Sequence, residues 1–303
     1  MKVLILHTLP PEAADEGRSV DEFDLSDAAR GIAEVLPEAA VVGVRGDVRE
    51  VLSLLAEHRP EVIFNACEAP LGRTDREAHV AALLEWMGVR FTGSGSETLA
   101  LCRRKDRVDA LLAAAGVPVP REGGGVFPCI VKPADEDGSA WVSHDSICED
   151  AAALERARAR IRGPVVAQEF LPGREFVVSL WGREEPEDVS VGETRFDGGL
   201  RLITYAAKWD VESADFANSE LFYDTEIDPP LRAAVVGAAR GAWRVVEARG
   251  CLRVDVRLDA EGRPRVIDVN PNPELGPGVG IYRAVEEAGW TWERFVRRQI
   301  EWA

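Results

Sequence analysis

Two stretches near the C-terminal end of the chain alternate apolar and polar residues with a period of two. They cover residues 252–258 and 264–270 and are separated by the turn-rich sequence Asp-Ala-Glu-Gly-Arg. This alternation predicts an antiparallel β-hairpin, in which every second side chain of a strand points to the same face. One face of the hairpin is apolar. The polar side chains of the other face are Arg253, Asp255, Arg257, Asp268 and Asn270.

The two carboxylates of this hairpin need partners. Uncompensated Asp255 and Asp268 would be costly beside an apolar layer, so we expect cations close to them. Carboxylate and carboxamide oxygens are hard ligands that suit Mg²⁺, which takes its remaining ligands from a nucleotide. The alternative is a solvated hairpin face with ordinary surface acids, and the hairpin alone does not decide between the two.

The first part of the chain alternates strand and helix patterns. A helix is predicted over residues 47–58, with Asp47 as its N-cap. The acidic segment 9–27 contains Pro-Pro and Gly, and we expect a loop or a short helix without a packing role. The predicted strands are residues 1–8, 41–44 and 61–67. Alternating strands and helices are typical of a small parallel α/β lobe.

A capping box at residues 74–77 predicts the start of another helix. Its apolar stripe comprises Val80, Leu83, Leu84 and Met87, and Gly88 ends it. The later predicted helices are residues 99–115, 149–162, 228–248 and 281–303, and the later predicted strands are residues 128–133, 165–181 around a Pro-Gly turn, and a strand ending at 204–208. A polar loop at residues 134–141 follows the first of these strands and is expected to close over phosphates.

Composition narrows the class of protein. The 303 residues carry a net charge of −17, which argues against nucleic-acid and anionic-membrane partners. No apolar run is long enough to span a bilayer, and the N-terminus lacks the pattern of a signal peptide. The five cysteines are scattered without a Cys-x-x-Cys motif, which predicts free thiols and a cytoplasmic location.

Arginine greatly outnumbers lysine, 32 residues to 4. A compact ammonium group fits against a phosphate in a tight cleft where a planar guanidinium does not. Lys105, Lys132 and Lys208 are therefore candidate phosphate ligands, whereas we expect no such role for Lys2.

The order of several motifs resembles the ATP-grasp superfamily, and within it the D-alanine–D-alanine ligase-like group. The motifs are a strand ending in Lys132, Gln-Glu-Phe-Leu-Pro-Gly-Arg-Glu-Phe at 168–176, Tyr-x-x-Lys-Trp at 205–209, and Arg-x-Asp followed by Asp-x-Asn-Pro in the hairpin. The resemblance runs from about Val62 to the C-terminus. It implies an α/β fold: an N-terminal parallel lobe (1–95), a central ATP-grasp lobe (96–180) and a C-terminal ATP-grasp lobe (181–303), with ATP between the last two.

The resemblance also implies roles for individual residues. Lys105 and Lys132 contact ATP phosphates, and Lys208 contacts the γ-phosphate. Arg253 stabilises the acyl-phosphate and the tetrahedral intermediate that follows it. The residues implied at the adenine edge and the ribose are Gln168, Glu169, Phe170, Leu171, Glu175 and Ile267, and those implied to hold two Mg²⁺ (or Mn²⁺) are Asp255, Asp268 and Asn270.

The chain also departs from the D-alanine ligases where they bind amino acids. Its N-terminal loop differs, Trp209 replaces a tyrosine, and the segment after Asn270 is rich in proline and glycine instead of containing serine. We therefore expect an ADP-forming carboxylate–amine ligase that acts on an amino acid or small peptide other than D-alanine. The alternatives are a peptide-modifying ligase or a non-enzymatic nucleotide-binding protein on the same fold. The sequence leaves the oligomeric state open, with a homodimer as one option.

Overall fold

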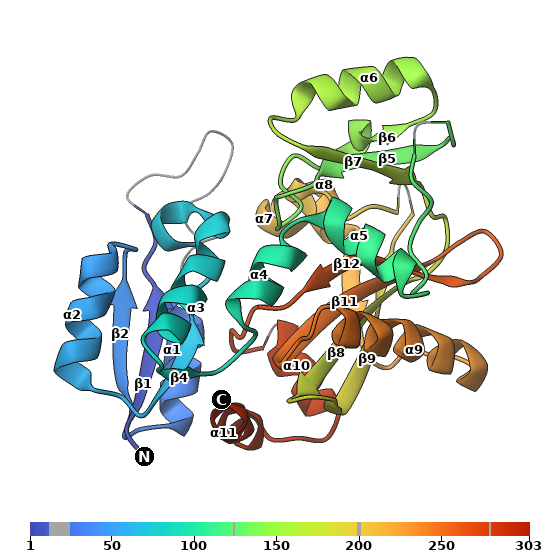
Figure 1. Cartoon of the computed structure of the whole chain (residues 1–303). Helices are drawn as coiled ribbons and strands as arrows, with labels where there is room; N and C mark the ends of the chain where they lie inside the picture. Colours follow the sequence, from blue (N-terminus) through green and yellow to red (C-terminus); the bar gives the residue numbers. More distant parts are fainter. Residues whose placement is uncertain (12–24, 124, 199–200, 279) are drawn as a thin grey trace.

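The structure is a computed structural model that describes residues 1–11, 25–123, 125–198, 201–278 and 280–303. Its strands form three sheets in three lobes (Figure 1). Most of the acidic segment 9–27 lies outside the described residues. None of the described helices is long and apolar enough to cross a lipid bilayer.

The N-terminal lobe is built on a parallel four-stranded sheet in the order β2-β1-β3-β4. Its strands are β1 (Val3–Thr8), β2 (Ala40–Val44), β3 (Val62–Ala66) and β4 (Arg90–Phe91), and its helices are α1 (Ser26–Val35), α2 (Val48–His58) and α3 (Glu77–Trp86). The predicted parallel α/β lobe is confirmed, and the Asp47 side chain caps α2 as expected by accepting from Arg49 N.

Alternate residues of β1 and β3 enter two different cores. Leu4 and Ile63 pack with α2 and α3, whereas Ile5 and Phe64 pack with α1 and the C-terminal helices. Trp181 of the C-terminal lobe lies in the second of these cores, in edge-on contact with Phe295. The C-terminal tail therefore joins the first and last lobes, because α10 (Gly280–Glu287) and α11 (Trp292–Trp302) bury their apolar faces between them (Figure 1).

The central lobe is a small antiparallel sheet in the order β6-β5-β7, covered by one helix. Its elements are β5 (Cys129–Pro133), the short η4 (His144–Ser146), β6 (Ile147–Cys148), α6 (Ala151–Arg160) and β7 (Val165–Glu169). Apolar side chains of β5 and α6 form its core, among them Val131 and Leu154.

The C-terminal lobe is a five-stranded antiparallel sheet in the order β10-β9-β8-β11-β12. α9 (Pro229–Val245) packs on it, and the Asp228 side chain caps its N-terminus by accepting from Leu231 N. The strands are β8 (Glu175–Gly182), β9 (Pro186–Phe196), β10 (Ser219–Phe222), β11 (Gly250–Leu258) and β12 (Pro264–Asn270). The predicted hairpin is thus confirmed as β11 and β12.

The chain passes from the central sheet to the C-terminal sheet between β7 and β8, through residues 170–174. β8 pairs with β9 and β11 along its whole length, so position 180, the expected lobe limit, lies inside this strand. We call residues 170–174 the joining segment.

Two predictions around the lysines were wrong. The strand expected to end at 204–208 is the short helix α7 (Tyr205–Trp209), because the Thr204 side chain accepts a hydrogen bond from Ala207 N and starts a helical turn. The helix expected over 99–115 is two helices, α4 (Ser96–Cys102) and α5 (Lys105–Ala114), because the backbone of Arg104 leaves the helical region. This break places Lys105 at the first turn of α5.

Two predictions about helix α3, its capping box and the extent of its apolar stripe, were also wrong. Residues 74–76 form the 3-10 turn η3 (Thr74–Arg76), which follows another, η2 (Pro70–Gly72), and α3 begins only at Glu77, so no capping box forms. Met87 is the C-cap and is half exposed, because the apolar stripe ends one turn earlier at the buried Leu84. Helix α1 and strand β9 were not predicted; the short α8 (Ala214–Ala217) follows α7.

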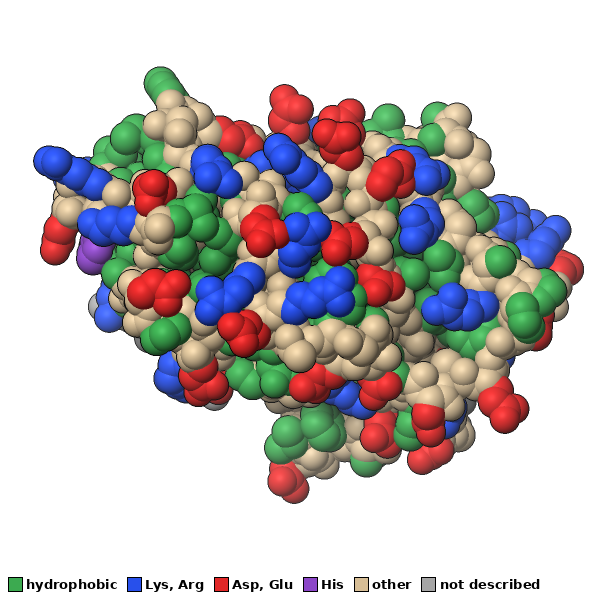
Figure 2. Space-filling model, turned by 90° about the horizontal axis from the view of Figure 1, so that it is seen from below, with side chains coloured by type: hydrophobic (Ala, Val, Ile, Leu, Met, Phe, Trp, Pro, Cys, Tyr) green, Lys and Arg blue, Asp and Glu red, His purple; other side chains and the backbone are tan. Residues whose placement is uncertain are grey.

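Figure 2 shows acidic and basic side chains interspersed on the face of the molecule that it draws.

Candidate active site

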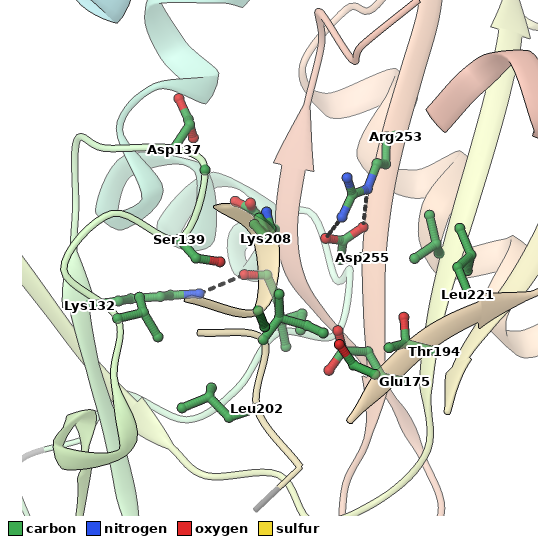
Figure 3. A pocket seen from close by; sticks show the side chains of 18 of the residues that line it. Lys132, Asp137, Ser139, Glu175, Thr194, Leu202, Lys208, Leu221, Arg253 and Asp255 are labelled. Carbon is green, nitrogen blue, oxygen red and sulfur yellow. Dashed lines mark hydrogen bonds and ion pairs between the residues drawn. The ribbon is translucent and has the colours of Figure 1, made fainter. Parts of the chain in front are cut away.

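A cavity of about 370 Å³ opens between the central and C-terminal lobes (Figure 3). Side chains from β5, the loop at 136–140, β8, α7 and the β11–β12 hairpin line it. The residues expected at a nucleotide site that lie in this cavity are Lys105, Lys132, Glu175, Lys208, Arg253, Asp255, Ile267 and Asp268. Residues up to 163 positions apart in the sequence, Lys105 and Asp268, are therefore brought together in one place.

The hairpin positions its polar side chains by strand register. Asp255 pairs directly with Asp268 across β11 and β12, and Arg253 pairs with Asn270. A register shift follows Asp255, so the strand is irregular beside the two acids. Arg253 holds Asp255 through two parallel bonds, Nε to Oδ1 at 2.8 Å and Nη2 to Oδ2 at 2.7 Å. The Asp255 carboxylate raises the pKa of Arg253 above its usual value in spite of burial, so this guanidinium is permanently charged.

Lys105 is the lysine most strongly bound to acids. Its side chain is 9 % exposed, and its Nζ lies 2.8 Å from Asp137 Oδ1 and 3.2 Å from Asp268 Oδ1. Burial alone would lower the pKa of Lys105, but the two carboxylates raise it. In the same way, burial would raise the pKa of Asp268, but Lys105 and Lys132 lower it to about 2.

Lys132 and Lys208 differ from Lys105 because the protein compensates their charges less. Lys132 donates from Nζ to the Ile267 carbonyl oxygen at 2.8 Å, a neutral partner (Figure 3). Burial lowers the pKa of Lys132 although Asp268 lies near it, and burial together with Arg253 lowers the pKa of Lys208. Two half-buried ammonium groups with lowered pKa values favour the binding of an external anion, which would stabilise their charged forms.

The loop at 136–140 closes one side of the cavity. Asp137 bonds Lys105, and the Trp209 indole Nε1 donates to the Gly138 carbonyl at 3.1 Å. Ser139 and Trp141 have positive backbone φ values of 58° and 63°. Residues other than glycine rarely adopt such values, so the surrounding structure constrains the loop here. This is the loop for which the sequence predicted a closing role, and α7 and α5 both hold it against the cavity.

Other predicted residues lie outside the cavity. Gln168 donates from Nε2 to Asp109 Oδ2 at 2.6 Å, and Glu169 pairs with Arg121. Phe170 and Leu171 line a second cavity on the joining segment. The backbone N–H groups of Glu169 and Phe170 already donate to the Arg121 and Pro128 carbonyl oxygens.

Asn270 lines a narrow neighbouring cavity together with Glu77 and Arg103. Its Oδ1 accepts a hydrogen bond from Asn272 N at 2.9 Å. Asn270 still shares the polar side of the hairpin with Asp268, two positions before it on β12.

The sequence did not single out three acids near the cavity. Glu68 directly follows β3, and burial followed by repulsion from Glu274 raises its pKa to about 8. Burial and Glu68 likewise raise the pKa of Glu77, and burial raises that of Glu274, which lines the cavity beside Arg253. One signal was available for Glu68, because ligand-binding residues of parallel α/β sheets follow the carboxyl ends of the strands.

The hairpin donors fit magnesium when the nucleotide supplies further ligands. Within the described residues, no group of three or more His, Cys, Asp or Glu side chains forms a complete metal cage. Two carboxylates in direct register and one carboxamide are an incomplete set of hard oxygen donors. Mg²⁺ is usually bound in this way, by one or two carboxylates plus substrate phosphates.

Comparison with known proteins assigns the chain to a family. Residues 121–301 match the family model described as D-ala D-ala ligase C-terminus, which covers more than half of the chain. The chain belongs to the D-alanine–D-alanine ligase family. It is an ATP-dependent ligase that joins a carboxylate to an amine, and the non-enzymatic alternative is not favoured.

The similarity to relatives covers most of the ligase, and the similarity to solved structures covers nearly all of it. A D-alanine–D-alanine ligase from Rhizobium meliloti (strain 1021) is 27 % identical over 273 residues, 84 % of each chain. One from Anaeromyxobacter sp. (strain Fw109-5) is 29 % identical over 244 residues, 75 % of the ligase and 74 % of the relative. The structure of the VanG D-Ala:D-Ser ligase from Enterococcus faecalis has a TM-score of 0.76 at 16 % identity, and covers 100 % of the ligase and 99 % of that chain. The ATP complex of the Bacillus anthracis D-alanine–D-alanine ligase has a TM-score of 0.73 at 17 % identity, and covers 99 % and 96 %. These structures share the fold, and the predicted ATP-grasp architecture is confirmed.

Proposed function

We propose that this ligase binds ATP and magnesium in the cavity between its central and C-terminal lobes and activates an amino acid or small peptide as an acyl-phosphate. An amine then attacks the acyl carbon, phosphate leaves, and an amide and ADP remain. One observation carries the proposal: three lysines and Arg253 gather around the register pair Asp255–Asp268 in a single cavity.

The positions of the residues that line the cavity indicate which part of the nucleotide each of them would bind. Lys105 and Lys132 would bind phosphate oxygens, and the Ile267 carbonyl that anchors Lys132 lies in the same wall. Glu175, the first residue of β8, would accept hydrogen bonds from the ribose hydroxyls. The segment from Gln168 to Leu171 would present backbone groups to the adenine edge, as the family resemblance implies.

Asp255, Asp268 and Asn270 would hold two magnesium ions, or manganese in their place. The bound ions supply charge neutralisation for the phosphates during transfer. Lys105 and Arg253 bind these carboxylates and must then share them with the magnesium ions. Short side-chain movements during closure of the site would allow this.

The ligase needs only positioning and charge stabilisation for this reaction. Lys208 would bind the γ-phosphate, and Arg253 would donate hydrogen bonds to the oxygen that becomes negative when the amine attacks. Burial raises the pKa values of Cys67 and Cys251 to about 12, so neither thiol is an activated nucleophile. This supports direct attack by the amine without a covalent enzyme intermediate.

We propose substrates other than D-alanine. The segment after Asn270 places Pro273 and Glu274 at the cavity, so a carboxylate lies beside Arg253 where the acceptor is expected. An acidic side chain there disfavours an acceptor that presents its own carboxylate, because like charges repel. The narrower alternative, a ligase that modifies peptides, uses the same cavity and stays open.

A panel of substrates tests this function. Phosphate release from ATP should rise at least about tenfold, some 1.4 kcal/mol, when the correct pair of carboxylate and amine is added. The panel contains D-alanine, L-amino acids, small carboxylates, diamines and dipeptides, and an Asp255→Asn variant serves as the inactive control. Release that no amine stimulates would contradict the ligase proposal, and strongest stimulation by D-alanine alone would contradict the proposed specificity.

The lobe limits at 95 and 180 remain predictions; the sheet memberships support a second limit within residues 170–174. ATP dependence and five buried free thiols support a cytoplasmic location.

A further inference from the structure

A buried ion pair lies at the ribose end of the cavity, and only one of its members has a role so far. Arg257 and Glu175 are direct cross-strand partners on β11 and β8. The Arg257 Nη1 lies 3.1 Å from Glu175 Oε2. Their side chains are 5 % and 8 % exposed, and both residues line the cavity.

Arg257 connects this pair to the surroundings of the nucleotide site. Its Nη2 donates to the Arg201 carbonyl oxygen at 2.6 Å, in the segment that leads to Lys208. Its guanidinium lies 5.0 Å from the ring centroid of Phe170, in the joining segment, and 5.8 Å from that of Phe196. The planar group is therefore fixed in orientation from three sides, as a flexible lysine would not be.

The pair leaves two polar atoms for a ligand. Within the described chain, Arg257 Nε is buried and has no hydrogen-bond partner. Glu175 Oε2 accepts from Arg257, whereas no described residue donates to Oε1. Burial raises the pKa of Glu175 and the Arg257 guanidinium opposes this rise, so the arginine favours the ionised carboxylate that accepts hydrogen bonds.

We propose that Arg257 is a positioning residue for ribose recognition: it fixes the Glu175 carboxylate so that the free oxygen meets a ribose hydroxyl of ATP. This inference rests on the proposed binding of ATP in this cavity. A hydrogen bond to a fixed, charged and buried acceptor is selective, because a nucleotide that lacks the hydroxyl leaves the acceptor unsatisfied. Without Arg257, Glu175 can protonate or rotate, and this selectivity disappears.

Calorimetric titration of the intact protein with ATP, 2′-deoxy-ATP and 3′-deoxy-ATP tests the inference. The wild type should bind at least one deoxynucleotide about tenfold or more weakly than ATP. In Arg257→Met this ratio should fall to within about twofold, because ATP loses affinity while that deoxynucleotide keeps its own within about threefold. Arg263→Met, which removes an arginine from the turn of the same hairpin, should keep the wild-type ratio.

Two further variants keep the test decisive. Adding Glu175→Gln to Arg257→Met should not change the ratio further, because both residues act through one hydrogen bond. Arg257→Lys retains the charge without the planar fork and should give an intermediate ratio; it also replaces Arg257→Met if that protein does not fold.

The outcomes separate this inference from the function on which it rests. Equal weakening of ATP and the deoxynucleotides in Arg257→Met, or a wild type that does not discriminate, would overturn the positioning role alone. A wild type that binds none of the three nucleotides would overturn the proposed ATP site itself.

Discussion

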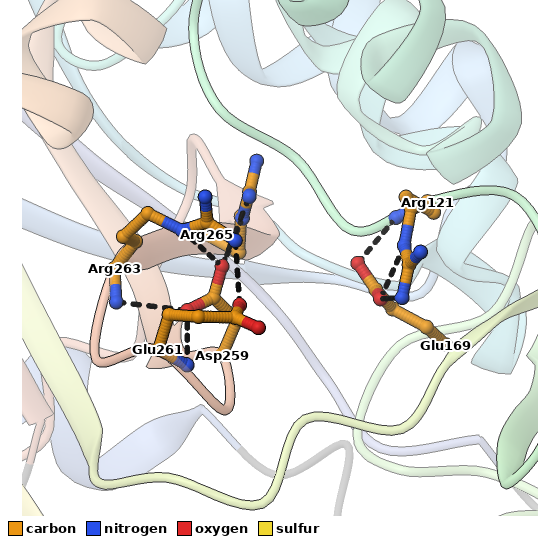
Figure 4. Close-up of polar contacts among 6 residues, drawn as sticks. All are labelled: Arg121, Glu169, Asp259, Glu261, Arg263 and Arg265. Atoms are coloured by element: carbon orange, nitrogen blue, oxygen red, sulfur yellow. Dashed lines mark hydrogen bonds and ion pairs between the residues drawn. The ribbon is translucent and has the colours of Figure 1, made fainter.

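The charged residues of the cavity and those of the hairpin turn are compensated to different degrees. In the cavity, Lys132 and Lys208 are half-buried and have lowered pKa values. In the hairpin turn, Asp259 accepts from Arg263 Nε and Arg265 Nη2, each at 2.9 Å (Figure 4). Arg121 and Glu169 form a separate pair nearby, 2.5 Å apart.

The hairpin-turn cluster, consisting of Asp259, Glu261, Arg263 and Arg265, is satisfied internally. Burial would raise the pKa of Asp259, but hydrogen bonds from Arg263 and Arg265 lower it to about 2. Arg263 is largely exposed, so water screens its charge. Such a cluster stabilises a turn and offers no unmet charge to a ligand.

The charged side chains of the cavity, in contrast, are not satisfied by the protein alone. The lysines of the cavity are held where the protein alone does not compensate them, and the pKa values of Glu68 and Glu77 are raised. Groups kept in such unfavourable states are typical of functional sites, where the ligand completes the electrostatics. Both clusters contain acidic and basic side chains, and the compensation of their charges distinguishes the cavity from the hairpin turn.

The largest effect that we expect among single changes outside the metal ligands is that of Arg253→Met. Arg253 would stabilise the developing oxyanion, and removal of one such donor usually lowers kcat by about 10²–10³. Steady-state ADP formation measures it. An unchanged kcat with a raised KM would instead place Arg253 in ground-state binding.

Glu68 predicts a dependence of stability on pH. Its pKa in the folded protein is about 8, against a usual 4.5, so the folded state binds more protons between these values and stability falls as pH rises through this window. Glu68→Gln removes this loss and should raise the free energy of unfolding by about 2 kcal/mol at pH 8.5, after discounting for partial exposure, and by little near pH 5. Thermal melts at the two pH values check it; equal shifts at both would show that Glu68 is not the titrating group.

Lys132→Arg probes the fit of an ammonium group. The Ile267 carbonyl accepts from Nζ at 2.8 Å in a half-buried place, and we expect that the larger planar guanidinium does not make the same contact. ATP affinity should fall about tenfold, or 1.4 kcal/mol, in spite of equal charge. Calorimetry with ATP measures this, and Arg263→Lys in the hairpin turn, which should leave ATP affinity unaltered, is the matched control.

Asp137→Asn should have a smaller effect of opposite sign. Asp137 binds Lys105 at 2.8 Å and so competes with a phosphate for the same ammonium group. Removing its charge should tighten ATP binding about threefold, since a partly exposed ion pair contributes under about 1 kcal/mol. Weaker binding would mean that Asp137 orders the loop for the nucleotide instead of competing with it.

The sequence predicted the parts of this site that depend on local patterns. Strict alternation in 252–258 and 264–270 predicted the hairpin, and strand register then placed Asp255 opposite Asp268. The break before Lys105 and the helix that carries Lys208 were missed, because single residues such as Arg104 and Thr204 decided them. A propensity summed over a window does not resolve such positions.

Ion pairs between side chains on different elements could not be predicted from the sequence pattern. We expected metal cations beside the hairpin acids, and the structure adds protein cations: Arg253 binds Asp255, and Lys105 binds Asp268 from a helix remote in sequence. Lys105 and Lys132 lower the pKa of Asp268 to about 2, so the negative charge of this carboxylate stabilises the folded state.

One measurement tests the central claim most directly: ADP formation at saturating magnesium and substrates by Asp268→Asn, compared with Asp259→Asn from the hairpin turn. Both changes remove one negative charge from an ion-paired aspartate on the same hairpin. If Asp268 holds the magnesium that neutralises the phosphates, its variant should lose at least about 10³-fold in turnover, whereas Asp259→Asn should stay within about twofold of wild type. Turnover within about twofold of wild type in Asp268→Asn, a difference of only a few tenths of a kcal/mol, would contradict the account.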